Sequence, residues 1–118
     1  MDIMRNSGLQ GNNLPFSLEA EQTVLGGLLL DPSVLPVVME FLKPESFFNE
    51  QHKDLFSIFM RMFSNGQTAD LITVLNEAVA MGVFETSAMA KSYLTGLMES
   101  IPSVANIASY CHIVEEKF

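Results

Sequence analysis

The chain has 118 residues, of which 48% are hydrophobic and 17% are charged, and its formal net charge is −8. This composition excludes an intrinsically disordered protein and predicts one ordinary domain with a compact core. The negative charge, with only six lysines and arginines, opposes binding to a polyanion such as DNA.

The first 13 residues differ in character from the rest of the chain. They combine glycines with asparagines and show no hydrophobic period, so we expect residues 1–13 to form a flexible tail. From Leu14 onward, apolar residues recur at separations of three and four and do not alternate with polar ones. This pattern predicts an all-α domain over residues 14–118, a compact orthogonal bundle of about six helices.

The first helix is predicted between Ser17 and Leu30. Ser17 is a residue type that caps helix N-termini with its side-chain oxygen. Glu19 and Glu21 would then lie in the first turn, where the helix dipole favours negative charge. The helix would end before Asp31 and would contain both glycines of the segment GGLLLDP.

A second helix is predicted from Pro32 to Leu42. Asp31 supplies a cap, Pro32 is favourable in a first turn, and Pro44 disfavours helical geometry shortly after Leu42. Pro36 is the difficulty, because its missing N–H would fall beyond the first turn. It either delays the regular part of the helix to about Pro36 or bends the helix slightly.

A third helix is predicted from Glu50 to about Asn65, with Asn49 as its N-cap and Gly66 as its stop. Most of its circumference is apolar, and a helix of this kind is surrounded by other helices. We therefore expect this helix to be the central element of the bundle, with Phe59 in the core.

Two further helices are predicted in the second half of the chain. The fourth runs from its cap Asp70 to Met81 and is stopped by Gly82, and the fifth runs from about Ser87 to Ser100. Their inward-facing residues are expected to be Leu71, Val74, Leu75, Ala78 and Val79 in the fourth helix and Tyr93, Leu94, Leu97 and Met98 in the fifth.

A sixth helix is predicted to start between Ser103 and Asn106. Its apolar stripe consists of Ile107, Tyr110, Cys111, Val114 and Phe118. The stripe still runs at Phe118 without a glycine or proline stop, so we expect the chain to be one piece of a longer protein. Phe118 is for this reason a candidate partner-interface residue.

Gly26 and Gly27 could either cradle a phosphate or let a neighbouring helix come close. A phosphate loop needs spaced glycines followed by Lys and Ser or Thr at the start of a helix, and no such lysine follows here. Inside a helix each glycine costs ~1 kcal/mol relative to alanine, which close packing against a neighbour would offset. We interpret Gly26 and Gly27 as helix-packing residues.

No residue pattern typical of a catalytic or metal site is found. Cys111 and His112 are adjacent on a helix and point in different directions, which leaves His52 as a third soft ligand. We expect Cys111 in the core, both histidines near the surface, and no catalytic residue, metal or cofactor. No acidic pair stands out as a catalytic dyad, and no calcium loop is present.

Phe47 and Phe48 lie between two predicted helices. Adjacent residues do not easily face inward together, so we place Phe47 in the core and Phe48 nearer the surface. Phe48 is either an exposed anchor for a partner or a partly buried side chain.

The number of cysteines and the hydropathy pattern indicate the cellular compartment in which we expect the chain. The one cysteine cannot form an internal disulfide, and no secretory signal pattern is present. The longest apolar run, residues 24–30, is far shorter than the ~20 residues that cross a bilayer. We expect a cytoplasmic chain that does not contact a membrane.

Several segments, in their order along the chain, resemble one known family. The similarity is to the N-terminal domain of bacterial replicative DNA helicases of the DnaB family, and it is carried by LPFSLEAEQTVLGGLLLDP, LKPESFFNEQHKDLF, TADLITVLNEAVAMGVFE and YLTGLMESIPSVANIASYCHIVEEK. The resemblance extends from about Leu14 to Lys117. Its most specific parts are Leu14-Pro15, Glu19-Ala20-Glu21, Val24-Leu25-Gly26, the entry from Asp70 to Thr73, and Ile101-Pro102-Ser103 with Asn106 and Tyr110.

This resemblance implies a non-catalytic role. In the family the domain is a small helical head followed by a helical hairpin, and it assembles into a collar above the motor ring, commonly as a trimer of dimers. The collar helps to organise the hexamer and takes part in docking primase and, in some systems, a helicase loader. ATP, Mg²⁺ and DNA translocation belong to a separate C-terminal RecA-like motor. Residues 14–118 would then be the collar head, without the hairpin, the motor or a cofactor.

Two function classes remain in contention. The first is an assembly and docking domain of a replicative helicase, with self-association, primase and possible loader contacts as its partners. The second is a free-standing helical adaptor of a phage or plasmid replication system. A small enzyme is a third reading, which no residue cluster supports. We expect no strong binding of this chain to nucleic acid and, without the hairpin, weak or no dimerisation.

Overall fold

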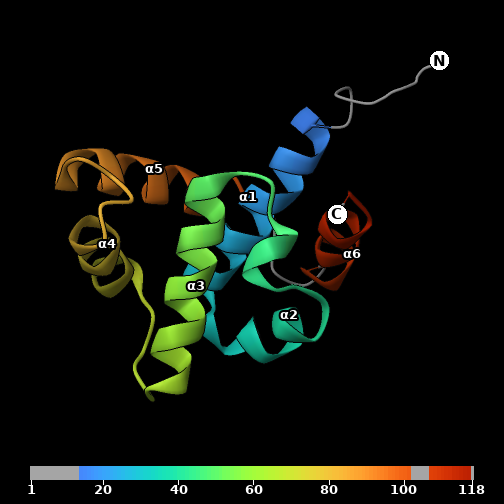
Figure 1. Cartoon of the computed structure of the whole chain (residues 1–118), viewed down its shortest axis with the longest axis horizontal. Helices are drawn as coiled ribbons and strands as arrows, with labels where there is room; N and C mark the ends of the chain where they lie inside the picture. Colours follow the sequence, from blue (N-terminus) through green and yellow to red (C-terminus); the bar gives the residue numbers. More distant parts are fainter. Residues whose placement is uncertain (1–13, 102–106, 118) are drawn as a thin grey trace.

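The computed structural model describes residues 14–101 and 107–117, which form six α-helices and two short 3-10 helices (Figure 1). The α-helices are α1 (Leu14–Leu30), α2 (Leu35–Phe41), α3 (Glu50–Ser64), α4 (Leu71–Ala80), α5 (Ser87–Glu99) and α6 (Ile107–Lys117). The 3-10 helices are η2 (Pro32–Val34) and η3 (Pro44–Ser46). No strand occurs within the described ranges, so the predicted all-α bundle of about six helices is confirmed. The predicted tail and the predicted start of the sixth helix lie outside these ranges.

Helix α1 is the central element of the bundle and packs against α3, α5 and α6 (Figure 1). All of its residues from Val24 to Leu29 are buried. Helix α3, in contrast, keeps a polar side on which Glu50, Asp54 and Arg61 are exposed. The prediction that α3 is central is therefore wrong. The aromatic residues of α3 suggested a central helix, but its charged residues keep one side in solvent, whereas the two glycines of α1 are compatible with close packing.

Helix α1 also begins earlier than predicted, at Leu14 rather than at Ser17. Pro15 is compatible with this start, because the N–H groups of a first helical turn have no acceptor within the helix. Glu19 and Glu21 consequently lie beyond the first turn, so the helix dipole does not account for them. Glu21 is wholly buried, which requires a different explanation.

The segment after α1 settles the role of Pro36. Asp31 accepts a hydrogen bond from the backbone N–H of Ser33 (3.2 Å) and so caps η2. Regular α-helix begins only at Leu35, which places Pro36 in the first turn of α2, where a missing N–H has no cost. The alternative in which Pro36 delays the helix is thus confirmed.

Side-chain caps fix the starts of the next three helices. Asn49, Asp70 and Thr86 each accept a hydrogen bond from the backbone N–H three residues later. Gly66 and Gly82, with φ angles of 72° and 78°, follow α3 and α4 in the left-handed conformation that glycine adopts without strain. The boundaries predicted for α3, α4 and α5 are confirmed to within about one residue.

One hydrophobic core joins residues from all six helices. Its largest wholly buried side chains include Phe47, Phe56 and Phe59. Apart from Ala90 of α5, the buried residues of α4, α5 and α6 belong to the predicted stripes. Within the described residues no single helix has both the length and the apolar character needed to cross a bilayer. Only a pair of segments bent by 118°, Leu18–Leu30 and Pro32–Phe41, meets those two criteria jointly.

Phe59 and Phe63 provide a matched test of this core. Phe59 is 1% exposed, so Phe59→Ala should lower the free energy of unfolding by about 3–5 kcal/mol through lost burial and a cavity. Phe63, one turn further along α3, is 50% exposed, and Phe63→Ala should cost less than ~1 kcal/mol. Urea unfolding followed by circular dichroism measures both. Equal losses in the two variants would contradict the placement of Phe59.

Candidate protein-interaction site

Gly26 of α1 lies where this helix meets the end of α5. A Cβ atom added to Gly26 would come within 2.5 Å of the backbone carbonyl oxygen of Leu97 and closer still to the Ile101 side chain. Such distances are inside van der Waals contact, so only glycine permits this approach. Gly27 is also buried, and its carbonyl accepts the N–H of Asp31 (2.8 Å) at the end of the helix.

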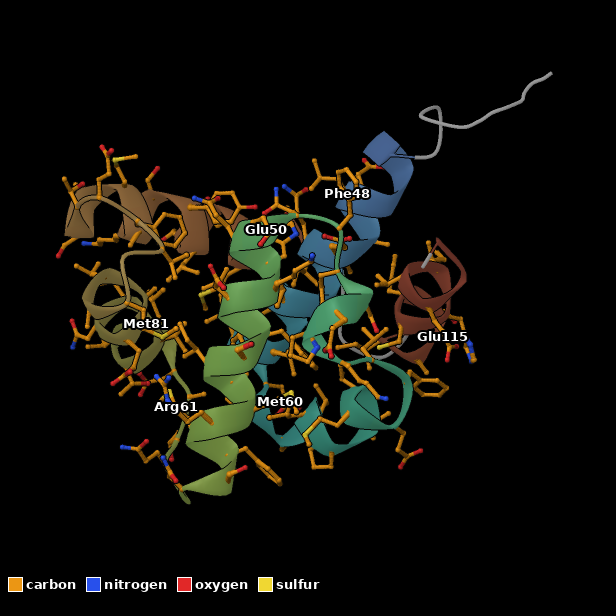
Figure 2. The ribbon with its side chains drawn as sticks, viewed as in Figure 1. Phe48, Glu50, Met60, Arg61, Met81 and Glu115 are labelled. Atoms are coloured by element: carbon orange, nitrogen blue, oxygen red, sulfur yellow. The ribbon has the colours of Figure 1, made fainter. Side chains whose placement is uncertain are left out.

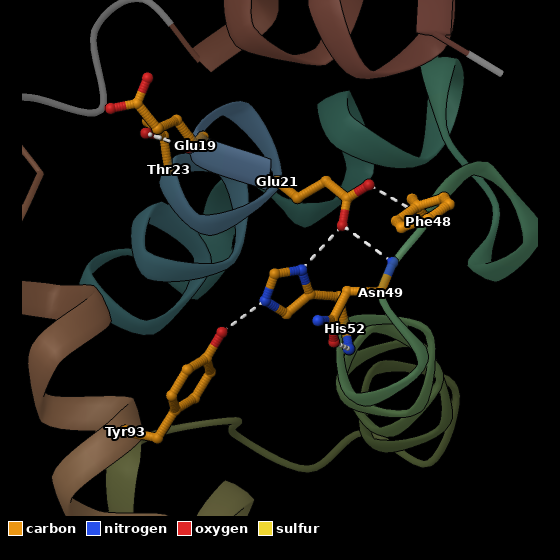
Figure 3. A network of polar contacts seen from close by, with 7 residues as sticks. All are labelled: Glu19, Glu21, Thr23, Phe48, Asn49, His52 and Tyr93. Atoms are coloured by element: carbon orange, nitrogen blue, oxygen red, sulfur yellow. Dashed lines mark hydrogen bonds and ion pairs between the residues drawn. The ribbon is translucent and has the colours of Figure 1, made fainter. Parts of the chain in front are cut away.

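A buried polar chain connects α1, α3 and α5 (Figure 3). The Glu21 carboxylate lies 2.7 Å from Nδ1 of His52, and Nε2 of His52 lies 2.6 Å from the hydroxyl of Tyr93. Glu21 and His52 are both 0% exposed. An ionised carboxylate only accepts hydrogen bonds, so His52 donates the Nδ1 proton to Glu21. In the neutral ring Nε2 then accepts the proton of the Tyr93 hydroxyl.

The same carboxylate holds the loop that leads into α3. Its Oε2 accepts the backbone N–H of Phe48 (2.6 Å), and its Oε1 accepts that of Asn49 at a longer distance of 3.4 Å. Burial of a carboxylate is costly unless hydrogen bonds replace its water. Three donors do so for Glu21, which fixes the path of the chain from Phe47 to Asn49.

Phe47 and Phe48 point to opposite sides of this loop. Phe47 is wholly buried, with its ring centroid 5.0 Å from that of Phe56, so its predicted place in the core is confirmed. Phe48 is 49% exposed, and it stands beside Glu50 at the N-terminal end of α3 (Figure 2). Phe118, the other residue predicted to contact a partner, lies outside the described residues.

A carboxylate, an imidazole and a hydroxyl linked in this order also occur in catalytic triads, where the hydroxyl is the nucleophile. The pKa of the Tyr93 hydroxyl argues against that use. Burial is the largest effect and raises the pKa of the Tyr93 hydroxyl. A hydrogen bond to Gln22 lowers this pKa and the charge of Glu21 raises it, and the net shift is upward. A nucleophile needs a lowered pKa or an adjacent base with access to substrate. The two hydrogen bonds tie three helices together, and the raised pKa of Tyr93 does not favour its use as a nucleophile.

His52 corrects the expectation that both histidines lie near the surface. Only His112 is exposed, with its ring edge-on to Phe41 at 4.6 Å. The sequence contains a signal for the buried pair. Glu21 precedes Val24, Leu25 and Leu28 at separations of three, four and seven, and His52 precedes Leu55, Phe56 and Phe59 at the same separations. Both polar residues thus occupy positions of an apolar stripe, which marks them as buried and mutually satisfied.

Cys111 lies in the core, as predicted. Burial, reinforced by the charge of Glu115, raises the pKa of its thiol to about 12. Within residues 14–101 and 107–117 no group of three or more His, Cys, Asp or Glu side chains is placed to hold a metal ion.

The chain is similar to several characterised proteins. A family described as "DnaB-like helicase N terminal domain" matches residues 13–116. Replicative DNA helicase DnaB of Geobacillus stearothermophilus is 41% identical over 103 residues, which are 87% of this chain and 22% of that protein. Replicative DNA helicase DnaC of Bacillus subtilis is 38% identical over 103 residues, which are again 87% of this chain and 22% of that protein. The present chain therefore spans about a fifth of the length of these relatives.

A solved structure agrees with the sequence relatives. The crystal structure of the N-terminal domain of DnaB helicase from Mycobacterium tuberculosis superposes with a TM-score of 0.77 and 35% sequence identity. The match covers 85% of this chain and 72% of that one.

The close approach at Gly26 predicts opposite effects of alanine at two glycines. Gly26→Ala should destabilise the domain by about 1–3 kcal/mol, because the added methyl group meets a backbone carbonyl that cannot rotate away. Gly96 lies in α5 with no atom within 4 Å of an added Cβ, so Gly96→Ala should stabilise by up to ~1 kcal/mol through helix propensity. Thermal melts measure both; two stabilising changes would refute the packing role.

The buried chain predicts a large effect of removing one carboxylate charge. Glu21→Gln places an amide NH₂ among three donors, and the domain should lose about 1–3 kcal/mol of stability. Glu19→Gln, two residues away and exposed, is the control and should change stability by less than ~0.5 kcal/mol. Urea titration distinguishes the two. Comparable midpoints would mean that the Glu21 contacts contribute nothing.

Proposed function

The chain belongs to the family of DnaB-like helicase N-terminal domains, and from this premise we propose that it is the non-catalytic collar head of a replicative DNA helicase. In this role it supports assembly of the helicase ring and docks primase or a helicase loader during DNA replication. The match over residues 13–116, together with a superposition that covers 72% of a solved N-terminal domain, carries the proposal.

The physical properties of the domain support this division of labour. A net charge of −8 and six scattered basic residues disfavour a nucleic-acid track, so we infer that DNA contacts belong to another part of the parent protein. The buried Glu21–His52–Tyr93 chain fixes helices rather than a substrate. ATP and Mg²⁺ would serve the motor domain of the parent, in the cytoplasm, and this chain would need neither.

The loop from Phe47 to Asn49 is a candidate contact point for a partner. Glu21 holds its backbone from within, and the half-exposed Phe48 ring stands on its outer side. Aromatic side chains on a fixed backbone lose little conformational entropy on binding, which suits them as anchors.

Four observations on the purified chain and its parent test the proposal. The chain alone should hydrolyse no ATP and should bind single-stranded DNA more weakly than about 10 μM at physiological salt. The parent gene should encode GxxxxGK[ST] downstream of residue 118, and a parent that lacks this domain should lose primase binding. An isolated gene without a motor would favour the free-standing adaptor. ATP turnover by the chain itself would refute a non-catalytic role.

A further inference from the structure

Two methionines, Met81 and Met89, are exposed among the residues that the structure describes, with exposed fractions of 45% and 50%. A thioether at the surface is open to oxidation to the sulfoxide, and methionine sulfoxide reductases reverse that reaction. Exposure of a methionine is ordinary by itself. The surroundings of the two sulfur atoms differ, however, and they decide what oxidation does to the domain.

The sulfur of Met81 lies against the guanidinium of Arg61. Nη1 of Arg61 is 3.5 Å from Sδ of Met81, and Nη2 of the same side chain pairs with the Glu77 carboxylate. Both Arg61 and Met81 lie where α3 and α4 meet (Figure 2). Arg61 therefore joins α3 to α4, a helix at the edge of the bundle that packs against α3 and α5 (Figure 1).

The contact between Arg61 and Met81 is weak in the reduced protein, because a thioether sulfur is a poor hydrogen-bond acceptor. A sulfoxide oxygen carries partial negative charge, so the guanidinium would donate to it a charge-assisted hydrogen bond, about twice as strong as a neutral one. Glu77 would keep its own contact, since the two acceptors use different nitrogens of Arg61. The Met81 backbone is already fixed, because its N–H donates to the carbonyl of Glu77 (2.9 Å).

Met89 has different surroundings. It lies in the first turn of α5 and lines a surface hollow together with Phe84 and Tyr93. Of the described residues that line this hollow, none is charged. A sulfoxide at Met89 would place a polar oxygen over an apolar surface without a charged donor, so its formation should not stabilise the domain.

We propose that Met81 is a site of reversible oxidation whose sulfoxide is held by Arg61, so that oxidation tightens the contact between α3 and α4. The oxidant is a hydroperoxide, such as hydrogen peroxide. The Met81 sulfur attacks one peroxide oxygen, an S–O bond forms and the O–O bond breaks. The sulfur loses two electrons, and the released hydroxide takes the proton of the transferred oxygen to give water. This property is separate from the proposed assembly and docking role and does not depend on it.

Melting temperatures of the whole chain, before and after limited treatment with hydrogen peroxide, test the proposal. In Met89→Leu, Met81 is the remaining exposed methionine of the described residues, and its oxidation should raise the melting temperature by about 2 °C or more. In Met81→Leu, oxidation of Met89 should give no rise. Peptide mass spectrometry identifies the methionine that carries the oxygen. Met1 and Met4 are present in every variant, so their oxidation cancels in the comparison.

Two further substitutions separate the two contacts of Arg61. Added to Met89→Leu, Arg61→Ala removes the donor of the sulfoxide, so the rise should disappear. Glu77→Gln in the same background keeps the guanidinium, so the rise should remain. Each variant is compared with its own reduced form, and the loss of the ion pair itself therefore does not enter the measured shift.

Reduction gives the last test. Methionine sulfoxide reductases A and B, which each act on one sulfoxide epimer, should together return the oxidised Met89→Leu chain to its starting melting temperature. Any of four results would overturn the proposal. Met81 stays a thioether when Met89 of the unsubstituted chain is oxidised; oxidation of Met81 gives no rise; the rise persists with Arg61→Ala or vanishes with Glu77→Gln; or the two reductases do not reverse it.

Discussion

The fold depends on the satisfaction of one buried carboxylate. Glu21 projects from the central helix and takes its hydrogen bonds from the backbone of the loop before α3 and from the imidazole of His52. His52 in turn contacts Tyr93 on α5. Because a buried charge without donors is far costlier than one hydrogen bond is worth, these segments can occupy only the relative positions that supply the donors. A purely apolar contact would let the helices slide along one another, whereas these hydrogen bonds fix the relative positions of α1, α3 and α5.

The second constraint is steric and acts on the same helix. Gly26 brings the backbone of α1 close to that of α5 near Leu97, less than two turns beyond Glu21. The two constraints together explain why α1, rather than the longer aromatic face of α3, lies at the centre. Small residues let helices approach, and one polar residue fixes their relative rotation. A module held in this way suits the docking role proposed above.

Local signals in the sequence predicted most of the helices, and long-range contacts account for the errors. Asn49, Asp70, Gly66 and Gly82 act within a few residues, so their capping roles are visible without a structure. The centrality of α1 and the burial of His52 depend on partners tens of residues away. A polar residue on an apolar stripe indicates burial but does not name its partner.

The sequence separations within the polar chain have a consequence for folding. Glu21 meets residues 27, 28 and 31 positions away, and His52 meets a residue 41 positions away. No local hairpin of helices can form this set, so a partly folded chain would hold an uncompensated charge in a forming core. Intermediates of that kind are disfavoured, and unfolding becomes all-or-none. The domain would transmit a mechanical load as one block, with no half that gives way before the other.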